Sequence, residues 1–356
     1  MGDALGAPVE FMSRNDIVRE FGVSGVRSFA PQDDEESKSI GWVTDDTQMT
    51  LFTAEGLLRA MTRRQSRGIG GGSSVLLAHA YVRWYATQTQ PFPAEAMDGF
   101  LVQQPWLFSQ RAPGRTVMAA LAANADVEFP RYKLGADNNS KGCGSVMRSA
   151  PFGLLADWKA GAMDAMDASF ITHGHRTASM SSAAFAAMIG LVVEGESIHG
   201  AVTGARSFIN GPYGNRSAQE TVAALDMAIA LSHKADISSA EAVASIGEGW
   251  VAEEALAIAA YSALAYPRED QVLDALSCAV SHSGDSDSTG SICGNLLGAA
   301  YGVESLPRTL MDRLEGLETI QTVADDFYRV VHGGEDLMEA DGYGVKEDWW
   351  RKYPGW

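Results

Sequence analysis

Apolar residues recur along most of the chain at the three- and four-residue spacing of α-helices, and no stretch alternates convincingly as a half-buried strand would. In the segment 47–64 the apolar side chains spread around most of the helical circumference, which is typical of a helix at the centre of a protein. The other predicted helices cover 75–87, 94–102, 115–124, a stretch after Ser145, a stretch from His175 to about 193, 198–208, 219–232, 239–247, 253–265, 269–281, a stretch that opens at 283–290, and 313–331.

The pattern predicts an all-α fold, and the simplest organisation is a single domain over residues 1–356. No internal repeat of 20–50 residues is visible. We expect the segments 31–39 and 65–74, rich in Asp, Glu, Ser and Gly, to be surface loops. The last part of the chain, 332–356, ends in a strongly aromatic tail that either docks on the body or covers an interface.

Two adjacent carboxylates, Asp45 and Asp46, follow Thr44 at the start of the central helix. Buried together without a partner they would destabilise the fold. A bound divalent cation would resolve this, because hard cations prefer oxygen ligands. The alternative is that Asp46 is a helix cap and Asp45 a favourable charge in the first turn.

A second acidic cluster, Ser-Gly-Asp-Ser-Asp-Ser-Thr-Gly at 283–290, also opens a helix. It is either an ordinary turn and cap or half of a metal site. An EF-hand is excluded, because no Glu follows at the required offset. If the two clusters share one dinuclear site, six oxygen ligands could hold two Mg²⁺ or Mn²⁺ ions: Thr44, Asp45, Asp46, Asp285, Asp287 and Ser288. Glycines 290, 294 and 298 are expected to pack this helix closely against the central one.

The segment Lys141–Arg148 has glycines at 142 and 144, which allow backbone N–H groups to form an anion-binding nest before a helix. A simple turn is the alternative. The sequence does not match a Walker loop or a dinucleotide fingerprint, since the required strand and spacing are absent. Nearby in the chain, His173 and His175 either ligate a metal, bind phosphate, or cap the following helix.

Two single residues are further candidates. Glu10 stands among apolar neighbours, where a carboxylate can be perturbed toward acid–base work, although a solvated Glu is the alternative. Trp250 follows a Gly-Glu-Gly turn and either stacks on a ligand ring or belongs to the core.

Composition narrows the class of protein. The formal net charge of −18 argues against a sequence-independent nucleic-acid binder and against binding to anionic membranes. Three cysteines cannot all pair with one another, which is the usage of a reducing compartment. No uninterrupted apolar run reaches the roughly 18 residues of a membrane span, and no signal region is visible. We therefore expect a cytoplasmic protein, and the acidic, Ala-rich composition suggests a bacterial one.

Five segments, in order, resemble those of the ADP-ribosylglycohydrolases, the family that includes dinitrogenase reductase-activating glycohydrolase and the ADP-ribosyl-arginine and ADP-ribosyl-serine hydrolases. The segments are Gly2-Asp3-Ala4-Leu5-Gly6 with Glu10, Thr44-Asp45-Asp46-Thr47, Gly142-Cys143-Gly144-Ser145-Val146-Met147-Arg148, Thr172-His173, and Gly284-Asp285-Ser286-Asp287-Ser288-Thr289-Gly290. Each motif is modest, but the ordered set is specific and covers almost the whole chain.

The resemblance implies an all-α fold with a dinuclear Mg²⁺ or Mn²⁺ centre. By matching positions, the six oxygen ligands named above hold the metals, with Asp287 bridging, and Glu10 acts in catalysis together with Asp45, Asp46 and Asp287. The residues implied to hold the diphosphate and ribose are Lys141, Gly142, Cys143, Gly144, Ser145, Val146, Met147 and His173, and Trp250 falls near a position that lines the ligand.

This chain departs from the family pattern at two points. Cys143 stands where many relatives have Asn, so a side-chain amide contact is lost or replaced. Relatives usually have an apolar helix before the first motif, whereas here Met1 directly precedes it, which puts the support of Glu10 in doubt.

The activity implied is metal-dependent removal of ADP-ribose from a modified protein side chain, with arginine expected, by cleavage of the glycosidic bond at C1″. The expected partners are an ADP-ribosylated protein, ADP-ribose and a cognate ADP-ribosyltransferase. The aromatic tail and the Gly-rich 65–74 loop motivate an alternative, a binding or immunity protein that neutralises an ADP-ribosylating toxin. A hydrolase of a small ADP-ribose derivative or of ADP-ribosylated nucleic acid is a further alternative.

Overall fold

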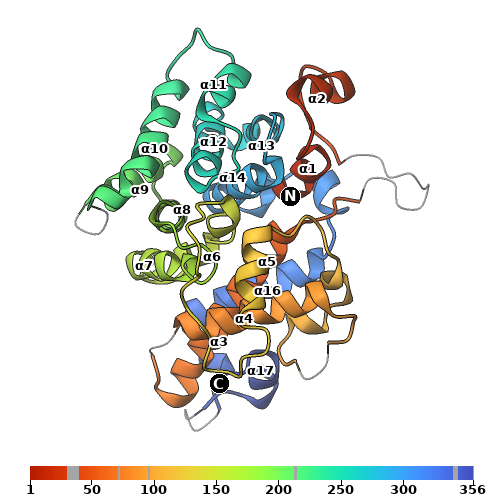
Figure 1. Cartoon of the computed structure of the whole chain (residues 1–356), viewed down its shortest axis with the longest axis vertical. Helices are drawn as coiled ribbons and strands as arrows, with labels where there is room; N and C mark the ends of the chain where they lie inside the picture. The colour runs from red at the N-terminus through yellow and green to blue at the C-terminus, as the bar shows by residue number, and fades with distance from the viewer. Residues whose placement is uncertain (30–39, 71–72, 95–96, 212–214, 340–343, 356) are drawn as a thin grey trace.

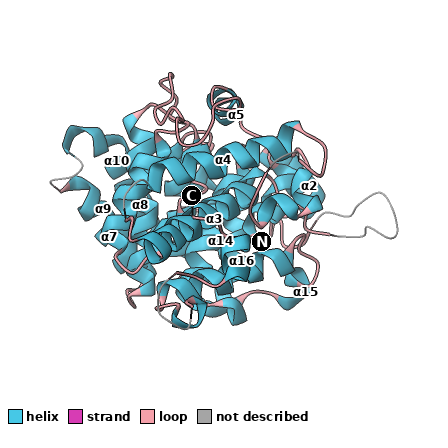
Figure 2. Ribbon diagram, turned by 90° about the horizontal axis from the view of Figure 1, so that it is seen from below, coloured by secondary structure: helices cyan, strands magenta, loops and turns pink. Residues whose placement is uncertain are grey.

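Helices make up nearly all of the regular structure, as the spacing of apolar residues predicts. The computed structural model describes residues 1–29, 40–70, 73–94, 97–211, 215–339 and 344–355. Among these residues the only β-type pairings are three isolated bridges, Gly41 with Leu314, Gly142 with Val251 and Met338 with Val345. Figure 2 shows helices joined by loops throughout. The predicted all-α fold is confirmed.

The described residues form seventeen α-helices. They are α1 (Gly2–Gly6), α2 (Arg14–Phe21), α3 (Asp45–Arg67), α4 (Ser73–Thr89), α5 (Arg115–Ala122), α6 (Ala150–Gly153), α7 (Trp158–Ser169), α8 (Arg176–Val193), α9 (Ile198–Asn210), α10 (Gln219–Ser232), α11 (Ser239–Ile246), α12 (Ala252–Ala265), α13 (Val272–Val280), α14 (Ser286–Tyr301), α15 (Arg308–Met311), α16 (Leu317–Val331) and α17 (Glu347–Lys352). Short 3-10 helices lie at Ala7–Val9, Leu101–Gln103, Pro105–Phe108, Cys143–Ser145, Asn215–Ala218, Glu269–Gln271, Val303–Ser305 and Glu335–Leu337.

Helix α3 is the central helix that the sequence predicts, and it is longer than the expected 47–64. It begins directly after Thr44, whose side chain accepts a hydrogen bond from the Asp46 N–H group, so Thr44 is the cap and Asp46 lies in the first turn. The helix ends at Gly68, which adopts the left-handed conformation (φ 66°) that glycine tolerates best. Because most of α3 is buried, its first turn carries Asp45 and Asp46 into the interior.

In Figure 1, helices α9 to α14 lie in the upper part of the molecule and α3, α4, α16 and α17 in the lower part. The short helix α1 lies against α14 with backbone touching backbone. A Cβ atom on Gly2 would overlap the carbonyl group of Gly290, and one on Gly6 would stand 2.5 Å from the Asp287 nitrogen. This close approach requires glycine, and it fixes α1 beside the first turn of α14.

The partner predicted for the glycine stripe of α14 is wrong. Gly290 and Gly294 face Gly2 of α1, and nothing lies within 4 Å of the Cβ position of Gly298. The spacing correctly indicates a close backbone approach, but it carries no information about which helix approaches. The clusters of α3 and α14 nevertheless meet, because the beginnings of both helices contact the same short α1 segment.

Several predicted boundaries also differ. The helix expected over 94–102 is replaced by bends and a 3-10 turn at Leu101–Gln103 in a proline-punctuated stretch, with residues 95–96 outside the described part. The segment after Ser145 forms only the single turn α6. Helix α16 begins at Leu317 and not at 313, because Gly316 adopts a left-handed conformation (φ 68°) directly before it. The predicted loop 31–39 lies outside the described residues.

The C-terminal tail docks on the body of the protein, one of its two predicted arrangements. The Trp349 indole N–H donates to the hydroxyl of Thr62 on α3 (2.9 Å), and the Tyr353 hydroxyl donates to Asp326 on α16 (2.8 Å). Both aromatic side chains are buried. Residues 340–343 and 356 of the tail lie outside the described part.

By length and composition, one of the described helices could cross a membrane. This helix is α8, with a mean hydropathy of 1.4, and 83% of it is buried inside the protein. Burial of this kind is typical of a core helix, so its composition alone is weak support for a membrane span.

Candidate metal centre

The two acidic clusters meet in the interior although they are far apart in sequence. Asp285 caps α14 by accepting a hydrogen bond from the Ser288 N–H group, as Thr44 caps α3. Ser288 Oγ then donates to Asp46 Oδ2 at 3.3 Å, across a sequence separation of 242 residues. The beginnings of α3 and α14 are therefore in direct contact, which is the juxtaposition that a shared site requires.

A third carboxylate, Asp3 of α1, holds the beginning of α3. It accepts hydrogen bonds from the Thr44 N–H group (3.1 Å) and hydroxyl (3.0 Å), and from the N–H group (3.1 Å) and hydroxyl of Thr47. Sequence reasoning gave Asp3 no role. The available signal was a carboxylate inside a small, apolar, glycine-flanked segment, where burial needs several donors to be tolerated.

Glu10 belongs to the same centre. The backbone contact of α1 with α14 brings the carboxylate oxygens of Glu10, Asp285 and Asp287 within 4.8 Å of one another. Its side chain is buried, so the solvated alternative for Glu10 is wrong. We call Glu10, Asp45, Asp46, Asp285 and Asp287 together the acidic centre.

Burial and mutual repulsion perturb the whole acidic centre. Burial raises the pKa of Asp45 and of Asp46 well above the usual range, and the carboxylate of Asp287 raises both further. Burial, followed by the carboxylate of Asp285, raises the pKa of Asp287 well above its usual range. Burial raises the pKa of Asp285 to about 6, and burial followed by Asp287 and Asp3 raises the pKa of Glu10 to about 8. Such shifts mean that the deprotonated centre is strongly disfavoured without added positive charge.

Of the described cations, Arg148 acts electrostatically on Asp45, but from beyond ion-pair distance. In the described part of the protein, no Lys, Arg or His forms an ion pair with a residue of the acidic centre. Asp46 Oδ1 is also buried with no hydrogen-bond partner among those residues. A donor set made of carboxylates and hydroxyls, with one oxygen left over, fits hard divalent cations such as Mg²⁺ or Mn²⁺.

The Lys141–Met147 loop borders the acidic centre. It pairs with the Trp250 segment, because the Cys143 N–H group donates to the Trp250 carbonyl (3.2 Å) and the Ala252 N–H group donates to the Lys141 carbonyl (2.8 Å). The Cys143 thiol donates to Asp285 Oδ2 at 2.6 Å, and burial raises the pKa of this thiol well above its usual range. The residue that replaces the family's usual Asn is therefore bonded to the acidic centre.

The side chain of Lys141 is already engaged. Its ammonium group donates to Glu220 Oε2 (2.6 Å) on α10 and to Glu253 on α12. The ammonium group is thus occupied by protein carboxylates, and the loop presents backbone groups and not this charge to a ligand. Of the two candidate histidines, His175 caps α8 by accepting from the Thr177 N–H group (3.1 Å), whereas His173 lies buried beside Gly142 and Gly144.

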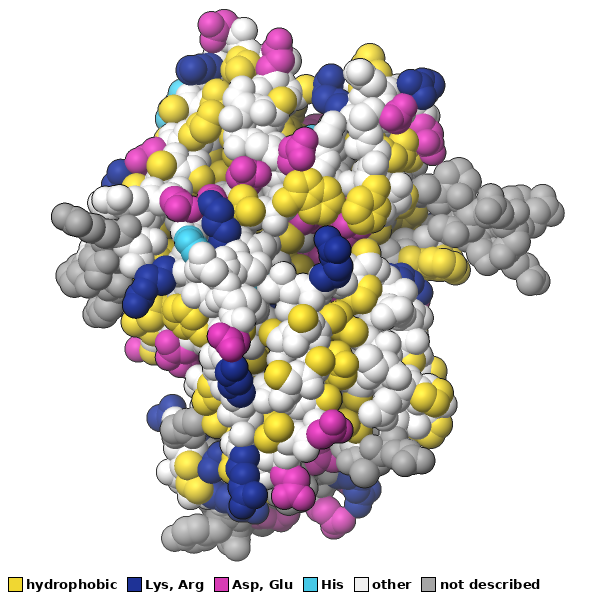
Figure 3. All heavy atoms as spheres, in the orientation of Figure 1, with side chains coloured by type: hydrophobic (Ala, Val, Ile, Leu, Met, Phe, Trp, Pro, Cys, Tyr) yellow, Lys and Arg dark blue, Asp and Glu magenta, His cyan; other side chains and the backbone are white. Residues whose placement is uncertain are grey.

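Trp250 lies half-exposed, so the prediction that it could be a core residue is wrong. It is 40% exposed, and its ring stacks on that of Phe11, with the centroids 5.9 Å apart and an interplanar angle of 22°. Phe11 directly follows Glu10 in the chain. Figure 3 shows hydrophobic side chains around a recess near the middle of this face, with Asp or Glu side chains visible inside it. The acidic centre is thus bordered by exposed aromatic surface.

A cavity of about 310 Å³ opens on the Glu10 side of this recess. Its lining includes Glu10, Phe11, Phe29, Trp42, Thr44 and Arg111. The guanidinium group of Arg111 lies over the Trp42 ring at 4.8 Å from the centroid and donates to Glu315 (2.7 Å). Three aromatic rings therefore line the same cavity as the Glu10 carboxylate and the metal-ligand candidate Thr44, and we call it the aromatic cavity.

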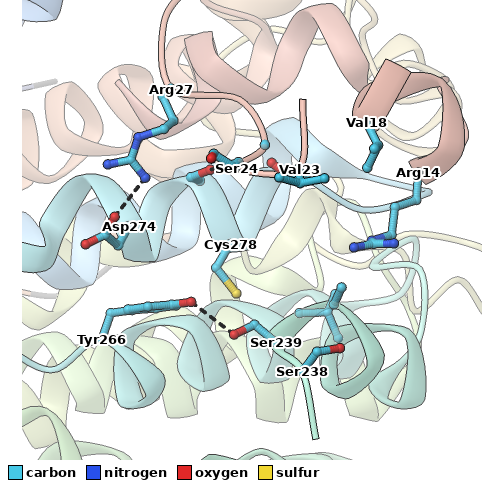
Figure 4. A pocket seen from close by; sticks show the side chains of 15 residues that line it. Arg14, Val18, Val23, Ser24, Arg27, Ser238, Ser239, Tyr266, Asp274 and Cys278 are labelled. Atoms are coloured by element: carbon cyan, nitrogen blue, oxygen red, sulfur yellow. Dashed lines mark hydrogen bonds and ion pairs between the residues drawn. The ribbon is translucent and has the colours of Figure 1, made fainter. Parts of the chain in front are cut away.

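A second cavity lies between α2, α11 and α13, as Figure 4 shows. Its polar groups are largely satisfied by the protein: Arg27 pairs with Asp274 (2.7 Å), Ser239 with Tyr266 (3.0 Å), and Ser277 donates to a backbone carbonyl. It contains none of the residues that the sequence singles out as candidate site residues. We assign it no role in the chemistry of the acidic centre.

The fold is all-α, and its buried acidic centre offers the oxygen donors that divalent cations prefer. A family model described as ADP-ribosylglycohydrolase matches residues 1–336, and the chain belongs to the ADP-ribosylglycohydrolase family. This family is one of glycohydrolases that act on ADP-ribosylated substrates.

The fold is shared with a solved structure described as an "ADP-ribosylglycohydrolase-related protein complex". The TM-score is 0.64, with 22% sequence identity over 93% of this chain and 94% of that chain. At this identity the likeness shows the fold. No curated protein sequence matches the chain.

Proposed function

We propose that this protein is a metal-dependent hydrolase that removes ADP-ribose from modified arginine side chains by cleaving the glycosidic bond at C1″. The observation that carries the proposal is the acidic centre, which is buried, lacks a cationic side chain, and borders both the glycine-containing loop and an aromatic cavity. Membership of the family supplies ADP-ribose linkages as the class of substrate.

The residues proposed to hold two divalent cations are Thr44, Asp45, Asp46, Asp285, Asp287 and Ser288. Contacts that support this set are those of Thr44 with Asp46, of Asp46 with Ser288, and of Asp285 with Ser288. When bound, Mg²⁺ or Mn²⁺ would neutralise these carboxylates and supply Lewis-acid and template chemistry at the ribose.

Glu10 is the proposed general base. Without cations, its pKa is raised to about 8 by burial and then by Asp287 and Asp3. Cations that neutralise Asp287 would remove the second of these causes and favour the carboxylate form of Glu10, which accepts the proton of the attacking water. The water oxygen forms a bond to C1″ as the C1″–N bond breaks. Its electron pair leaves with the nitrogen of the guanidinium cation, which departs as a neutral guanidine and then takes up the proton from Glu10.

The remaining groups position ADP-ribose. Backbone N–H groups of the loop from Lys141 to Met147 and the ring of His173 would contact the diphosphate and ribose, and Trp250 offers an exposed aromatic face. The usual two-carboxylate glycosidase scheme does not map directly onto this site, because the other carboxylates of the acidic centre are assigned to cations.

The aromatic cavity supports arginine as the modified residue. A guanidinium group is planar and packs against aromatic faces while pairing with carboxylates. The cavity offers Phe11, Phe29 and Trp42 beside Glu10. Arg111 already displays this combination within the protein, since its guanidinium group lies over Trp42 and pairs with Glu315.

A release assay tests the proposal. Arginine-, serine- and nucleic-acid-linked ADP-ribose are incubated with the protein in Mg²⁺, in Mn²⁺ or in chelator. We expect release of ADP-ribose from the arginine-linked substrate in either metal, loss of release in chelator, and loss in Asp287→Asn. The matched control is Asp270→Asn, an exposed acid whose partner is Arg268. Full release in chelator would overturn the proposed mechanism, and preferential release from another linkage would overturn the choice of arginine.

A further inference from the structure

Arg148, the last residue of the glycine-loop motif, is a buried cation without a carboxylate partner. Its side chain is 1% exposed, and its guanidinium group lies over the Tyr81 ring at 4.2 Å from the centroid. It donates to the Thr172 hydroxyl (2.7 Å) and to the Ala168 carbonyl (3.4 Å), and no carboxylate of the described residues pairs with it. Burying an unpaired cation is costly, and the hydrogen bonds of Arg148 offset only part of that cost.

The hydrogen bonds of Arg148 impose a direction on a short relay. A guanidinium group can only donate, so Thr172 Oγ1 accepts from Arg148. The single proton of the Thr172 hydroxyl is then available to the Nδ1 atom of His173, which lies 2.8 Å away. Thr172 is fully buried, and no other acceptor for its hydroxyl proton is found among the described residues, so Nδ1 accepts this proton and the ring proton of the neutral imidazole resides on Nε2.

The environment also keeps His173 neutral. Burial and then the nearby Arg148 lower the pKa of His173 to about 3. A second positive charge beside an unpaired buried guanidinium group would be strongly disfavoured. His173 thus offers one N–H donor and no charge.

The Nε2 atom of His173 faces the glycine loop. It would lie 3.4 Å from a Cβ atom on Gly142 and 3.6 Å from one on Gly144. The side chain is 1% exposed, and no described residue accepts a hydrogen bond from Nε2. A ring donor without a described protein acceptor, facing a loop that lacks side chains at these two positions, can be completed by an oxygen atom of a ligand.

We propose that Arg148 and Thr172 are positioning residues that hold His173 in the neutral tautomer with its proton on Nε2, so that His173 donates a hydrogen bond to an oxygen atom of ADP-ribose in the Lys141–Met147 loop. The identity of the ligand rests on the proposed function. The tautomer follows from contacts within the protein and can be measured without any ligand.

The first experiment is nitrogen-15 NMR of histidine-labelled, ligand-free protein in Mg²⁺, with His173→Gln used to assign the signals. We expect His173 to be the Nε2–H tautomer at pH 7 and to stay neutral at pH 5. Thr172→Val should give a mixture of tautomers, and Thr172→Ser, which retains the hydroxyl, should restore the wild-type signature. A wild-type Nδ1–H tautomer, a charged ring at pH 5, or an unchanged Thr172→Val spectrum would each overturn the relay.

The second experiment is ADP-ribose binding by calorimetry in Mg²⁺. Loss of one well-directed hydrogen bond predicts that Thr172→Val binds roughly 2- to 10-fold more weakly, with Thr172→Ser close to wild type. The control is Thr221→Val, which removes another buried hydroxyl, bonded to Ser181 at 3.0 Å, and should leave affinity unchanged. Equal binding by Thr172→Val and wild type would overturn the ligand contact. If wild-type protein fails to bind ADP-ribose, the proposed function and the ligand contact fail, and the NMR result still decides the relay.

Discussion

Helix α3 carries two buried groups of charged residues, and only one of them is electrostatically complete. At its beginning lie Asp45 and Asp46 of the acidic centre. Two turns or so further along lies a group that we call the ion-pair cluster, made of Glu55, Arg59, Arg83 and Asp98. Both groups use buried residues of α3, whereas Arg83 lies on α4 and the Asp98 side chain is 40% exposed, so their different composition is informative.

The charges of the ion-pair cluster pair with one another, although Arg59 Nε and the Nε and Nη1 atoms of Arg83 have no hydrogen-bond partner among the described residues. Arg83 pairs with Glu55 at 2.7 Å with both side chains fully buried, and the other oxygen of Glu55 accepts from the N–H groups of Phe100 (2.7 Å) and Leu101 (3.0 Å). Arg59 pairs with Asp98 at 2.9 Å. The acidic centre has carboxylates of the same kind and no cationic side chain among the described residues. The first arrangement is structural, whereas we propose that the second binds cations from solution.

The largest effect is expected when the ion-pair cluster is broken. Arg83→Met leaves the Glu55 carboxylate buried without its cation, and should lower the free energy of unfolding by about 3–5 kcal/mol. Urea denaturation monitored by circular dichroism measures this loss. The loss should be the same in chelator and in Mg²⁺, because this cluster binds no cation. A loss that Mg²⁺ repairs would show that the two groups are not independent.

Divalent cations should stabilise the wild-type protein through the acidic centre alone. At about 100 times the dissociation constant, Mg²⁺ or Mn²⁺ should raise the free energy of unfolding by about 2.7 kcal/mol for each ion bound. Denaturation curves in chelator and in increasing metal concentrations measure this gain. Arg83→Met should show the same gain from its lower starting point, and identical wild-type curves with and without metal would contradict the contrast between the two clusters.

The pH dependence should differ between the metal-free and metal-loaded protein. In chelator the folded-state pKa of Glu10, about 8, exceeds its unfolded value of 4.5, so the folded protein binds more protons between these values. The stabilisation that protonated Glu10 contributes is then fully present below about pH 4.5. It decreases as the pH rises toward 8, by about 1.4 kcal/mol per pH unit for each proton. Unfolding free energies from pH 5 to 8 test this. The decrease in unfolding free energy with pH should be smaller in saturating Mg²⁺. A metal-free unfolding free energy that increases from pH 5 to 8 would contradict the prediction.

Asp287→Asn should have the smallest effect on stability, with a sign that depends on metal. In chelator the substitution removes a repelling carboxylate and should stabilise the protein by about 1 kcal/mol, whereas in Mg²⁺ it removes a ligand and should destabilise it by a similar amount. Thermal melts in both conditions measure the two signs. Destabilisation of equal size in both would mean that Asp287 contributes packing and hydrogen bonds only.

The parts of the fold that depend on local pattern were predictable. The spacing of apolar residues indicates the helices, and Thr44-Asp45-Asp46 and the 283–290 cluster are each recognisable within a few residues. What the pattern lacks is the partner of each element. The glycine face of α14 packs on α1 and not on α3, and Asp3 holds Thr44 and Thr47 across 41 and 44 residues.

The relay from Arg148 to His173 was also out of reach of local pattern. It joins residues 24 positions apart through one hydroxyl, and nothing in either motif indicates which hydrogen-bond partner each side chain takes. The two prolines at 91 and 93 likewise leave the stretch 94–102 ambiguous between helix and turn. Contacts over long sequence distances decide these features, and a single sequence carries them only indirectly.

The central claim is that the acidic centre, unlike the ion-pair cluster, is a binding site for divalent cations. Calorimetric titration with Mn²⁺ tests it on three proteins: wild type, Asp287→Asn, and Asp98→Asn as the control from the ion-pair cluster. We predict two bound ions per wild-type chain, the same in Asp98→Asn, and affinity weaker by at least about 10-fold in Asp287→Asn. Absence of Mn²⁺ binding to the wild type, or equal binding by Asp287→Asn, would contradict the account.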